Sequence, residues 1–216
     1  RAYDGDGEQT VRVRITDDRG ATGVSAPLTI QVTNRPPRVT SVTWTPMDPT
    51  DAEEFALSAV VHDPDGTVMR WQWALGDKTV AAGKAPTLGL PDDGVYSLIL
   101  TLEDDDGTRS DPFPFDITVA NAPPIAQFSA THVAPRCVLF HAEDSYDPSP
   151  TGEIVHVAWD FGDGTTCPGS PDGCGGASRW TPQHCYRGAG TYIVTLTVID
   201  EQGAIARAIR SIVIAD

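Results

Sequence analysis

The sequence lacks any run of apolar residues long enough to span a membrane, and it is poor in basic residues. It holds 15 Lys and Arg against 30 Asp and Glu, which gives a formal net charge of −15. Because such a surface repels phosphate backbones and anionic lipid headgroups, we expect neither nucleic-acid binding nor membrane insertion. The same surplus of carboxylates suits divalent cations, which prefer hard oxygen ligands.

Cysteine is missing from most of the chain. All four cysteines lie between positions 137 and 185, and they match no close Cys-x-x-Cys pattern. An even number of cysteines in a turn-rich chain favours disulfides, and therefore an oxidising compartment.

A helical period is also absent, and short alternating runs are separated by turns rich in Gly and Pro. In the middle of the chain this alternation predicts five strands, at Val39–Trp44, Phe55–Val61, Val68–Leu75, Tyr96–Leu102 and Phe115–Val119. About seven short strands in roughly 90 residues indicate an antiparallel β-sandwich. We therefore predict an all-β fold of tandem antiparallel β-sandwiches.

One structural unit is repeated along the chain. An alternating strand ends in Asp-x-x-Gly at Asp17, Asp104 and Asp200. The spacing from Asp17 to Asp104 equals the spacing from Asn34 to Asn121, where the linker motif Asn-x-Pro-Pro recurs. Two independent markers at one period predict a repeat of domain size.

The Pro-Pro pairs mark the boundaries, because proline lacks an N–H donor and favours an extended connector. They predict an incomplete module at residues 1–35, a complete module at 36–122 and a module with a cysteine-bearing insertion at 123–216. Residues 1–35 hold only the last two strands of a copy, with Val11, Val13 and Ile15 on an apolar face that a lone hairpin cannot bury. Either this stretch is a fragment of a longer array, or a neighbouring chain supplies the missing strands.

The third copy contains a run of motifs, Asp144-Ser145-Tyr146-Asp147, Trp159-Asp160-Phe161-Gly162-Asp163-Gly164, His184-Cys185-Tyr186 and Gly190-Thr191-Tyr192. The second copy keeps a degenerate form of the central motif, Trp73-Ala74-Leu75-Gly76-Asp77. These motifs resemble the PKD (polycystic kidney disease) domain, an immunoglobulin-like β-sandwich. The resemblance implies non-catalytic extracellular or cell-surface modules of the kind found in microbial secreted hydrolases, surface-layer proteins and adhesins.

The resemblance implies a spacer, adhesion or assembly element that acts through protein partners or through self-assembly of its repeats, and not an enzyme. Two alternatives stay open. The chain is either a carbohydrate- or protein-binding accessory region of a secreted hydrolase, with an extracellular polysaccharide as one partner, or a subunit of an extracellular filament or surface layer. No Ser/His/Asp or Cys/His triad can be argued from the order of the residues.

A calcium site is predicted at the start of the second module. Asp63 and Asp65 lie two residues apart in a turn, Asp104 ends a strand at the same end of the predicted sandwich, and Asn34 lies in the entering linker. Three carboxylates and an amide oxygen form the ligand set that calcium prefers. PKD domains of bacterial collagenases, which these positions resemble, bind calcium with a similar arrangement. The alternative is that Asp-Pro-Asp-Gly is only a turn.

The third module carries a weaker version of this site, at Asn121, Asp147 and Asp200. It is weaker because Ser149 and Pro150 interrupt the turn. In both modules we expect calcium to clamp the linker to the domain that follows.

The four cysteines allow three pairings, and we favour Cys137–Cys185 and Cys167–Cys174. The alternative is a zinc site that uses cysteines of the insertion together with His184. The spacing of these residues is loose for a compact structural zinc site.

The aromatic motif lies on a strand with a period of two. Its apolar face comprises Val155, Val157, Trp159 and Phe161, and the matching set is Met69, Trp71, Trp73 and Leu75. Such alternation predicts a core strand rather than a platform for sugar rings. Trp180 lies outside the stripe and is the better candidate for an exposed aromatic, although packing is favoured for it too. Asp160, Asp163 and Gly164 are expected to build the turn after the strand.

Overall fold

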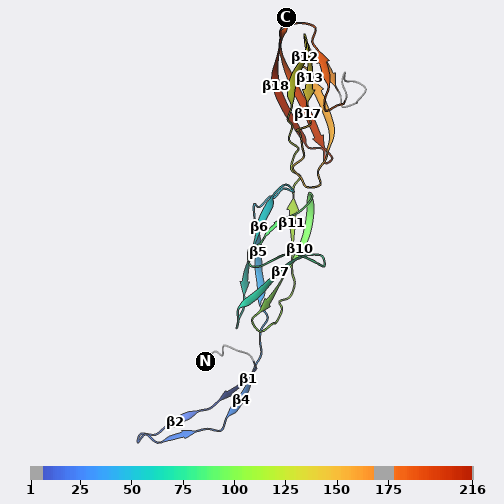
Figure 1. The fold of residues 1–216 in the computed structure, drawn as a ribbon. Helices are drawn as coiled ribbons and strands as arrows, with labels where there is room; N and C mark the ends of the chain where they lie inside the picture. The colour runs from blue at the N-terminus through green and yellow to red at the C-terminus, as the bar shows by residue number, and fades with distance from the viewer. Residues whose placement is uncertain (1–6, 168–177, 216) are drawn as a thin grey trace. The chain divides into compact units, whose positions relative to one another are not determined.

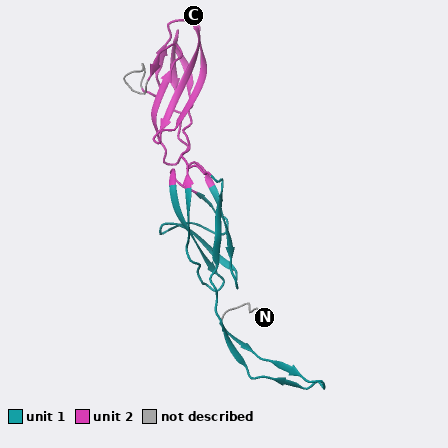
Figure 2. Cartoon of the chain, turned by 180° about the vertical axis from the view of Figure 1, so that it is seen from behind, with its two compact units in different colours: residues 1–47, 55–88, 95–117 teal, residues 48–54, 89–94, 118–216 magenta. Residues whose placement is uncertain are grey.

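The computed structural model describes residues 7–167 and 178–215 of the chain (Figure 1). The secondary structure of these residues consists of β-strands, as the sequence predicts. Within the described ranges, no helix is long and apolar enough to cross a membrane. The chain divides into two compact units (Figure 2). The first, drawn in teal, comprises Arg1–Met47, Phe55–Leu88 and Val95–Ile117. The second, drawn in magenta, comprises Asp48–Glu54, Gly89–Gly94 and Thr118–Asp216.

The N-terminal part forms two short antiparallel ladders. Strand β1 (Gly7–Val11) pairs with β4 (Leu28–Val32), and β2 (Arg14–Thr16) pairs with β3 (Thr22–Val24). The apolar side chains of this hairpin remain open to solvent: Val13 is 61% exposed and Ile15 is 68% exposed.

The second module consists of two antiparallel sheets. One has the order β5-β6-β9 and the other β11-β10-β7-β8. The strands are β5 (Arg38–Thr45), β6 (Glu54–His62), β7 (Val68–Leu75), β8 (Lys78–Ala82), β9 (Thr87–Gly89), β10 (Gly94–Asp104) and β11 (Phe113–Val119). Each of the five strands predicted from the alternation lies within one of these strands. The core between the sheets includes Phe55, Leu57, Trp73, Leu98, Leu100 and Ile117.

The third module repeats this topology strand for strand. Its sheets have the orders β12-β13-β16 and β15-β14-β17-β18. The strands are β12 (Ser129–Ala134), β13 (Cys137–His141), β14 (Ile154–Asp160), β15 (Thr166–Cys167), β16 (Gln183–Cys185), β17 (Gly190–Asp200) and β18 (Ile205–Ile214). The two modules are therefore copies of one architecture, as the repeat predicts.

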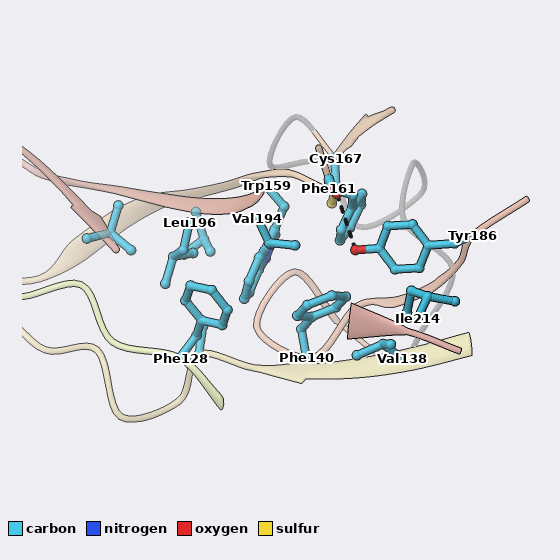
Figure 3. Close-up of a cluster of buried hydrophobic side chains, with 13 residues drawn as sticks. Phe128, Val138, Phe140, Trp159, Phe161, Cys167, Tyr186, Val194, Leu196 and Ile214 are labelled. Carbon is cyan, nitrogen blue, oxygen red and sulfur yellow. Dashed lines mark hydrogen bonds between the residues drawn. The ribbon is translucent and has the colours of Figure 1, made fainter. Parts of the chain in front are cut away.

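Aromatic side chains fill the core of the third module (Figure 3). The ring centroid of Trp159 lies 5.1 Å from that of Phe128 and 5.3 Å from that of Phe140. Phe161 extends this cluster, and its carbonyl oxygen accepts a hydrogen bond of 3.2 Å from the Tyr186 hydroxyl. Fully burying side chains of this size contributes about 1.5–3 kcal/mol each, so the motif strand anchors the fold.

The predicted apolar stripe is wrong at one end in each module. Val155 is 48% exposed and Met69 is 65% exposed. In the ladder between β14 and β17, Val155 is the extra residue of a β-bulge, and Ile154 packs against the core in its place. Met69 is skipped in the same way between β7 and β10. A bulge inverts the period-two alternation, so the residue before it takes the buried position.

Candidate functional site

Asp104 ends strand β10 and is buried. Its Oδ2 accepts a hydrogen bond of 2.8 Å from Asn34 Nδ2, and its Oδ1 accepts bonds from the backbone N–H groups of Thr108 (2.7 Å) and Asp106 (3.1 Å). Burial acts to raise the pKa of Asp104, but the bonds from Asn34 and the backbone outweigh it and hold that pKa below its ordinary value. The structure thus joins the linker to a carboxylate that stays ionised.

Asp63 shapes the turn after β6. Its Oδ1 accepts hydrogen bonds from the N–H groups of Gly66 (3.1 Å) and Asp65 (3.4 Å). Its Oδ2 is buried and has no hydrogen-bond partner, whereas the Asp65 side chain is exposed. The predicted ligands therefore fall into two sets, Asn34 with Asp104 and Asp63 with Asp65.

Asp105 is a site residue that the sequence reasoning missed. Its Oδ1 accepts a 2.8 Å hydrogen bond from the Thr67 N–H. A Cβ placed on Gly66 would overlap this oxygen and lie 3.3 Å from Asp63 Oδ2, so glycine lets the two carboxylates approach one point. These residues, together with Asp65 and linker residues, line a hollow of about 780 Å³. The run of three aspartates that begins at Asp104 was the signal in the sequence.

The third module repeats the arrangement with its own residues. Asn121 Nδ2 donates a 2.8 Å hydrogen bond to Asp200 Oδ2, and Asp200 Oδ1 accepts one of 2.7 Å from the Ala204 N–H. Asp147 Oδ1 accepts a 2.9 Å bond from the Ser149 N–H, as Asp63 does in its own turn. The Oδ1 atom of Asn121 and the Oδ2 atom of Asp147 are buried without partners.

Negative charge is concentrated around Asp147. Burial raises its pKa, and the nearby carboxylates of Glu201, Asp200 and Asp51 raise it further. A buried oxygen without a hydrogen-bond partner is costly, and a hard divalent cation satisfies such atoms. The unpartnered oxygens of Asp63, Asn121 and Asp147 are therefore compatible with calcium.

A disulfide links Cys137 and Cys185, the first of the two pairs favoured from the sequence. The two residues face each other in the ladder between β13 and β16. Cys167 is also disulfide-bonded, and Cys174, its predicted partner, lies outside the described residues. The zinc alternative is wrong for Cys185 and Cys167, because a sulfur in a disulfide is not a thiolate ligand.

The turn of the aromatic motif is built as predicted. Asp160 Oδ1 accepts a 2.9 Å hydrogen bond from the Gly162 N–H, and Asp163 Oδ1 accepts one of 3.0 Å from the Thr165 N–H. Gly162 and Gly164 both have positive φ angles, of 80° and 87°. These carboxylates accept hydrogen bonds from backbone N–H groups, so they stabilise the turn.

His184 joins this turn, a contact that the sequence reasoning missed. Its Nε2 lies 2.8 Å from Asp163 Oδ2, and its ring stacks on Phe161 with centroids 4.2 Å apart. The Thr165 hydroxyl lies 3.3 Å from the same Nε2. Because the aspartate and the hydroxyl meet the same ring nitrogen, the trio is not arranged as a nucleophilic relay.

Trp180 is partly buried and packs against the core of the third module. Its carbonyl oxygen accepts a 2.9 Å hydrogen bond from the Ala142 N–H. The packing role favoured from the sequence is therefore confirmed for this residue.

Comparison with known proteins identifies the family. The family model described as PKD domain matches residues 34–119 and 121–214. The chain belongs to the PKD domain family. The matches begin at Asn34 and Asn121, so each linker asparagine is the first residue of the PKD domain that follows it.

One curated relative is a microbial collagenase of Vibrio alginolyticus, 35% identical over 99 residues, which are 45% of this chain and 11% of the relative. The chain thus spans about a tenth of the length of that protein. Among solved structures, the PKD1 domain of Vibrio anguillarum Epp is 32% identical, with 44% of this chain and 96% of that chain covered and a TM-score of 0.36. The PKD1 domain of Vibrio cholerae metalloprotease PrtV is 30% identical, with 44% and 100% covered and a TM-score of 0.36.

Proposed function

We propose that this chain is a non-catalytic accessory region of an extracellular protein, in which tandem PKD domains act as a spacer stiffened by calcium. The observation that carries the proposal is the linker asparagine, which bonds to a buried aspartate at the end of a strand in both modules. Disulfide-bonded cysteines and relatives that include a collagenase and a metalloprotease support an extracellular location.

Both modules offer calcium a linker asparagine, a turn aspartate and an aspartate at a strand end. These are Asn34, Asp63 and Asp104 in the second module and Asn121, Asp147 and Asp200 in the third, and the second module adds Asp65 and Asp105. A bound ion would supply positive charge to buried carboxylate and amide oxygens. The asparagine would then be held to both the strand end and the ion, which restricts the linker.

Thermal unfolding with and without calcium tests this proposal. We expect calcium at about 1–10 mM to raise the midpoint, because a ligand that binds only the folded state stabilises it, by about 2.7 kcal/mol at a hundred times its Kd. Asp63→Asn should reduce the shift, and the exposed control Asp77→Asn should leave it unchanged. An unchanged midpoint at millimolar calcium would remove the calcium part of the proposal.

The spacer part has its own test. Two fluorophores on either side of residues 34–37 report the spread of distances across this linker by single-molecule energy transfer. Calcium should narrow that spread in the natural chain and leave it broad in Asn34→Ala. A spread that does not respond to calcium would show that the ion does not stiffen this linker.

A binding role in an accessory region is the second candidate, and the similarity to a collagenase favours it. Pull-down of the folded chain on collagen and on insoluble polysaccharides tests it. Retention on one polymer, lost when the chain is heat-unfolded, would support this function. Passage through every polymer at physiological salt would leave the spacer role.

Self-assembly through the N-terminal hairpin is the third candidate. Its apolar side chains Val13, Ile15 and Leu28 are all more than half exposed. A second copy of the chain would cover this face if the two hairpins packed together. We expect a concentration-dependent dimer in analytical ultracentrifugation that Ile15→Lys abolishes. Thr22→Lys, on the other face of the β2–β3 ladder, should leave it intact, and a monomer at all concentrations would exclude assembly.

A further inference from the structure

Asp51 is a buried carboxylate outside the predicted calcium sites. It lies in the turn before β6 and is 2% exposed. Its Oδ1 accepts a 2.8 Å hydrogen bond from the Ala122 N–H. Its Oδ2 is buried and has no hydrogen-bond partner. An ionised oxygen in this position needs a positive partner, because burying a charge without one is costly.

Two further carboxylates meet Asp51. Asp92 and Asp93 belong to the loop before β10, and one oxygen of each of the three aspartates lies within 4.8 Å of the others. Within the described ranges this is the one such group of three or more acidic, histidine or cysteine side chains. No basic side chain among those residues lies within salt-bridge distance of Asp51.

The chemistry of the group selects the ion. Its ligands are oxygens with no histidine or cysteine, which disfavours zinc. Calcium accepts irregular sets of carboxylate and carbonyl oxygens, whereas magnesium demands near-ideal octahedral geometry and gives up water reluctantly. A hollow of about 310 Å³ beside Asp51 is lined by Glu53 and Glu54 and by apolar residues that include Leu90.

We propose that Asp51, Asp92 and Asp93 form a calcium site of their own, one that uses none of the residues of the two linker sites. The turn that carries Asp51 is already tied to the chain that enters the third module. The Asp51 N–H donates to the Ala120 carbonyl oxygen at 3.0 Å, and the Ala120 N–H donates to that of Pro49 at 2.9 Å. A cation on Asp51 therefore holds residues 120–122 to the loop of Asp92 and Asp93.

Calorimetric titration of the whole chain with calcium chloride tests the site. Asp51→Asn keeps the shape of the side chain and an acceptor for the Ala122 N–H, but removes the charge. It should weaken one class of calcium sites by at least about tenfold and leave the linker site of the second module unchanged. Asp77→Asn, exposed and not a member of the group, should titrate like the natural chain. An Asp51→Asn titration identical to that of the natural chain would overturn the proposal.

Thermal unfolding separates an ion site from a purely structural aspartate. In a chelator, Asp51→Asn should be at least as stable as the natural chain, because it no longer buries an uncompensated charge. In calcium it should be the less stable of the two. Equal loss of stability in both media would assign Asp51 a structural role and overturn the proposal. Asp63→Asn should retain this site, so the linker site of the second module and this one can fail independently.

Discussion

Asp163 is hydrogen-bonded on both carboxylate oxygens although it lies in the turn after β14. Thr165 binds Oδ1 through its N–H and its hydroxyl, and His184 binds Oδ2. Burial acts to raise the pKa of Asp163, but these bonds outweigh it and hold the pKa below its ordinary value of 3.8. The ionised carboxylate is therefore worth more to the folded chain than to the unfolded one.

The first prediction concerns the pH dependence of this group. Above pH 3.8, Asp163→Asn should cost about 1.5–3 kcal/mol of unfolding free energy, since it weakens charge-assisted hydrogen bonds. As pH falls through 3.8, the unfolded chain takes up the proton first, so the natural chain loses this stabilisation. The difference in unfolding free energy between the natural chain and the variant therefore narrows. Urea unfolding from neutral pH to about pH 3 measures it. If that difference stays constant through the acid range, the hydrogen bonds are not the cause of the lowered pKa of Asp163.

The second prediction compares two glycines of the motif. Both have positive φ, but a Cβ on Gly162 would overlap the backbone of Ile193, whereas a Cβ on Gly164 meets nothing within 4 Å. Gly164→Ala should cost about 1–2 kcal/mol through its backbone conformation. Gly162→Ala should cost clearly more, because the backbone of β17 must also move. Equal costs in chemical denaturation would show that β17 relaxes freely.

The sequence could predict those side chains whose partners are local. Asp160 and Asp163 cap the turn that follows their own strand, and this is visible in the motif. Asp51 and His184 could not be found in this way, because their partners at Ala122 and Asp163 are distant in the sequence and are brought near by the fold.

At the scale of strands, one bulge recurs in both modules. It places Met69 and Val155 on the surface, next to the strand ends that carry Asp104 and Asp200. An alternating pattern predicts which residues form a strand, but not where the partner strand skips one of them. All five strands predicted for the second module were therefore found, while one end of the apolar stripe was not. The short strands β8 and β9 were missed, because β9 has only three residues and the sequence of β8 does not alternate between apolar and polar residues.

The third prediction concerns the disulfide between β13 and β16. Replacing both Cys137 and Cys185 by alanine should cost the third module about 2–4 kcal/mol, because the unfolded chain gains the freedom that the bond removes. Denaturant unfolding of the oxidised chain measures this cost. The second module contains no cysteine and serves as the internal control, so its transition should not move. Loss of stability in both modules would contradict a local effect.

At the scale of the whole molecule, an excess of carboxylates covers two modules of the same topology. The formal charge is −15, and carboxylates that contribute to it provide the hard oxygen ligands suited to calcium. The same charge repels polyanions, because an acidic surface cannot replace the counterions that surround a phosphate or sulfate polymer.

The fourth prediction follows from this charge. The chain should pass through heparin and DNA columns without retention at about 0.15 M salt, with and without calcium. A basic protein of similar size, run as a control, should be retained. Retention of the natural chain would show a local basic patch that outweighs its net charge.

The bond between Cys137 and Cys185 also matters for a chain pulled from its two ends. An unfolding domain lengthens by up to about 3.5 Å for each residue it releases. The bond spans a sequence separation of 48 residues, which withholds roughly 170 Å of extension. Residues 36–122 contain no cysteine and can release their full length. Under tension, the second module can therefore extend completely, whereas a covalent bond limits the extension of the third.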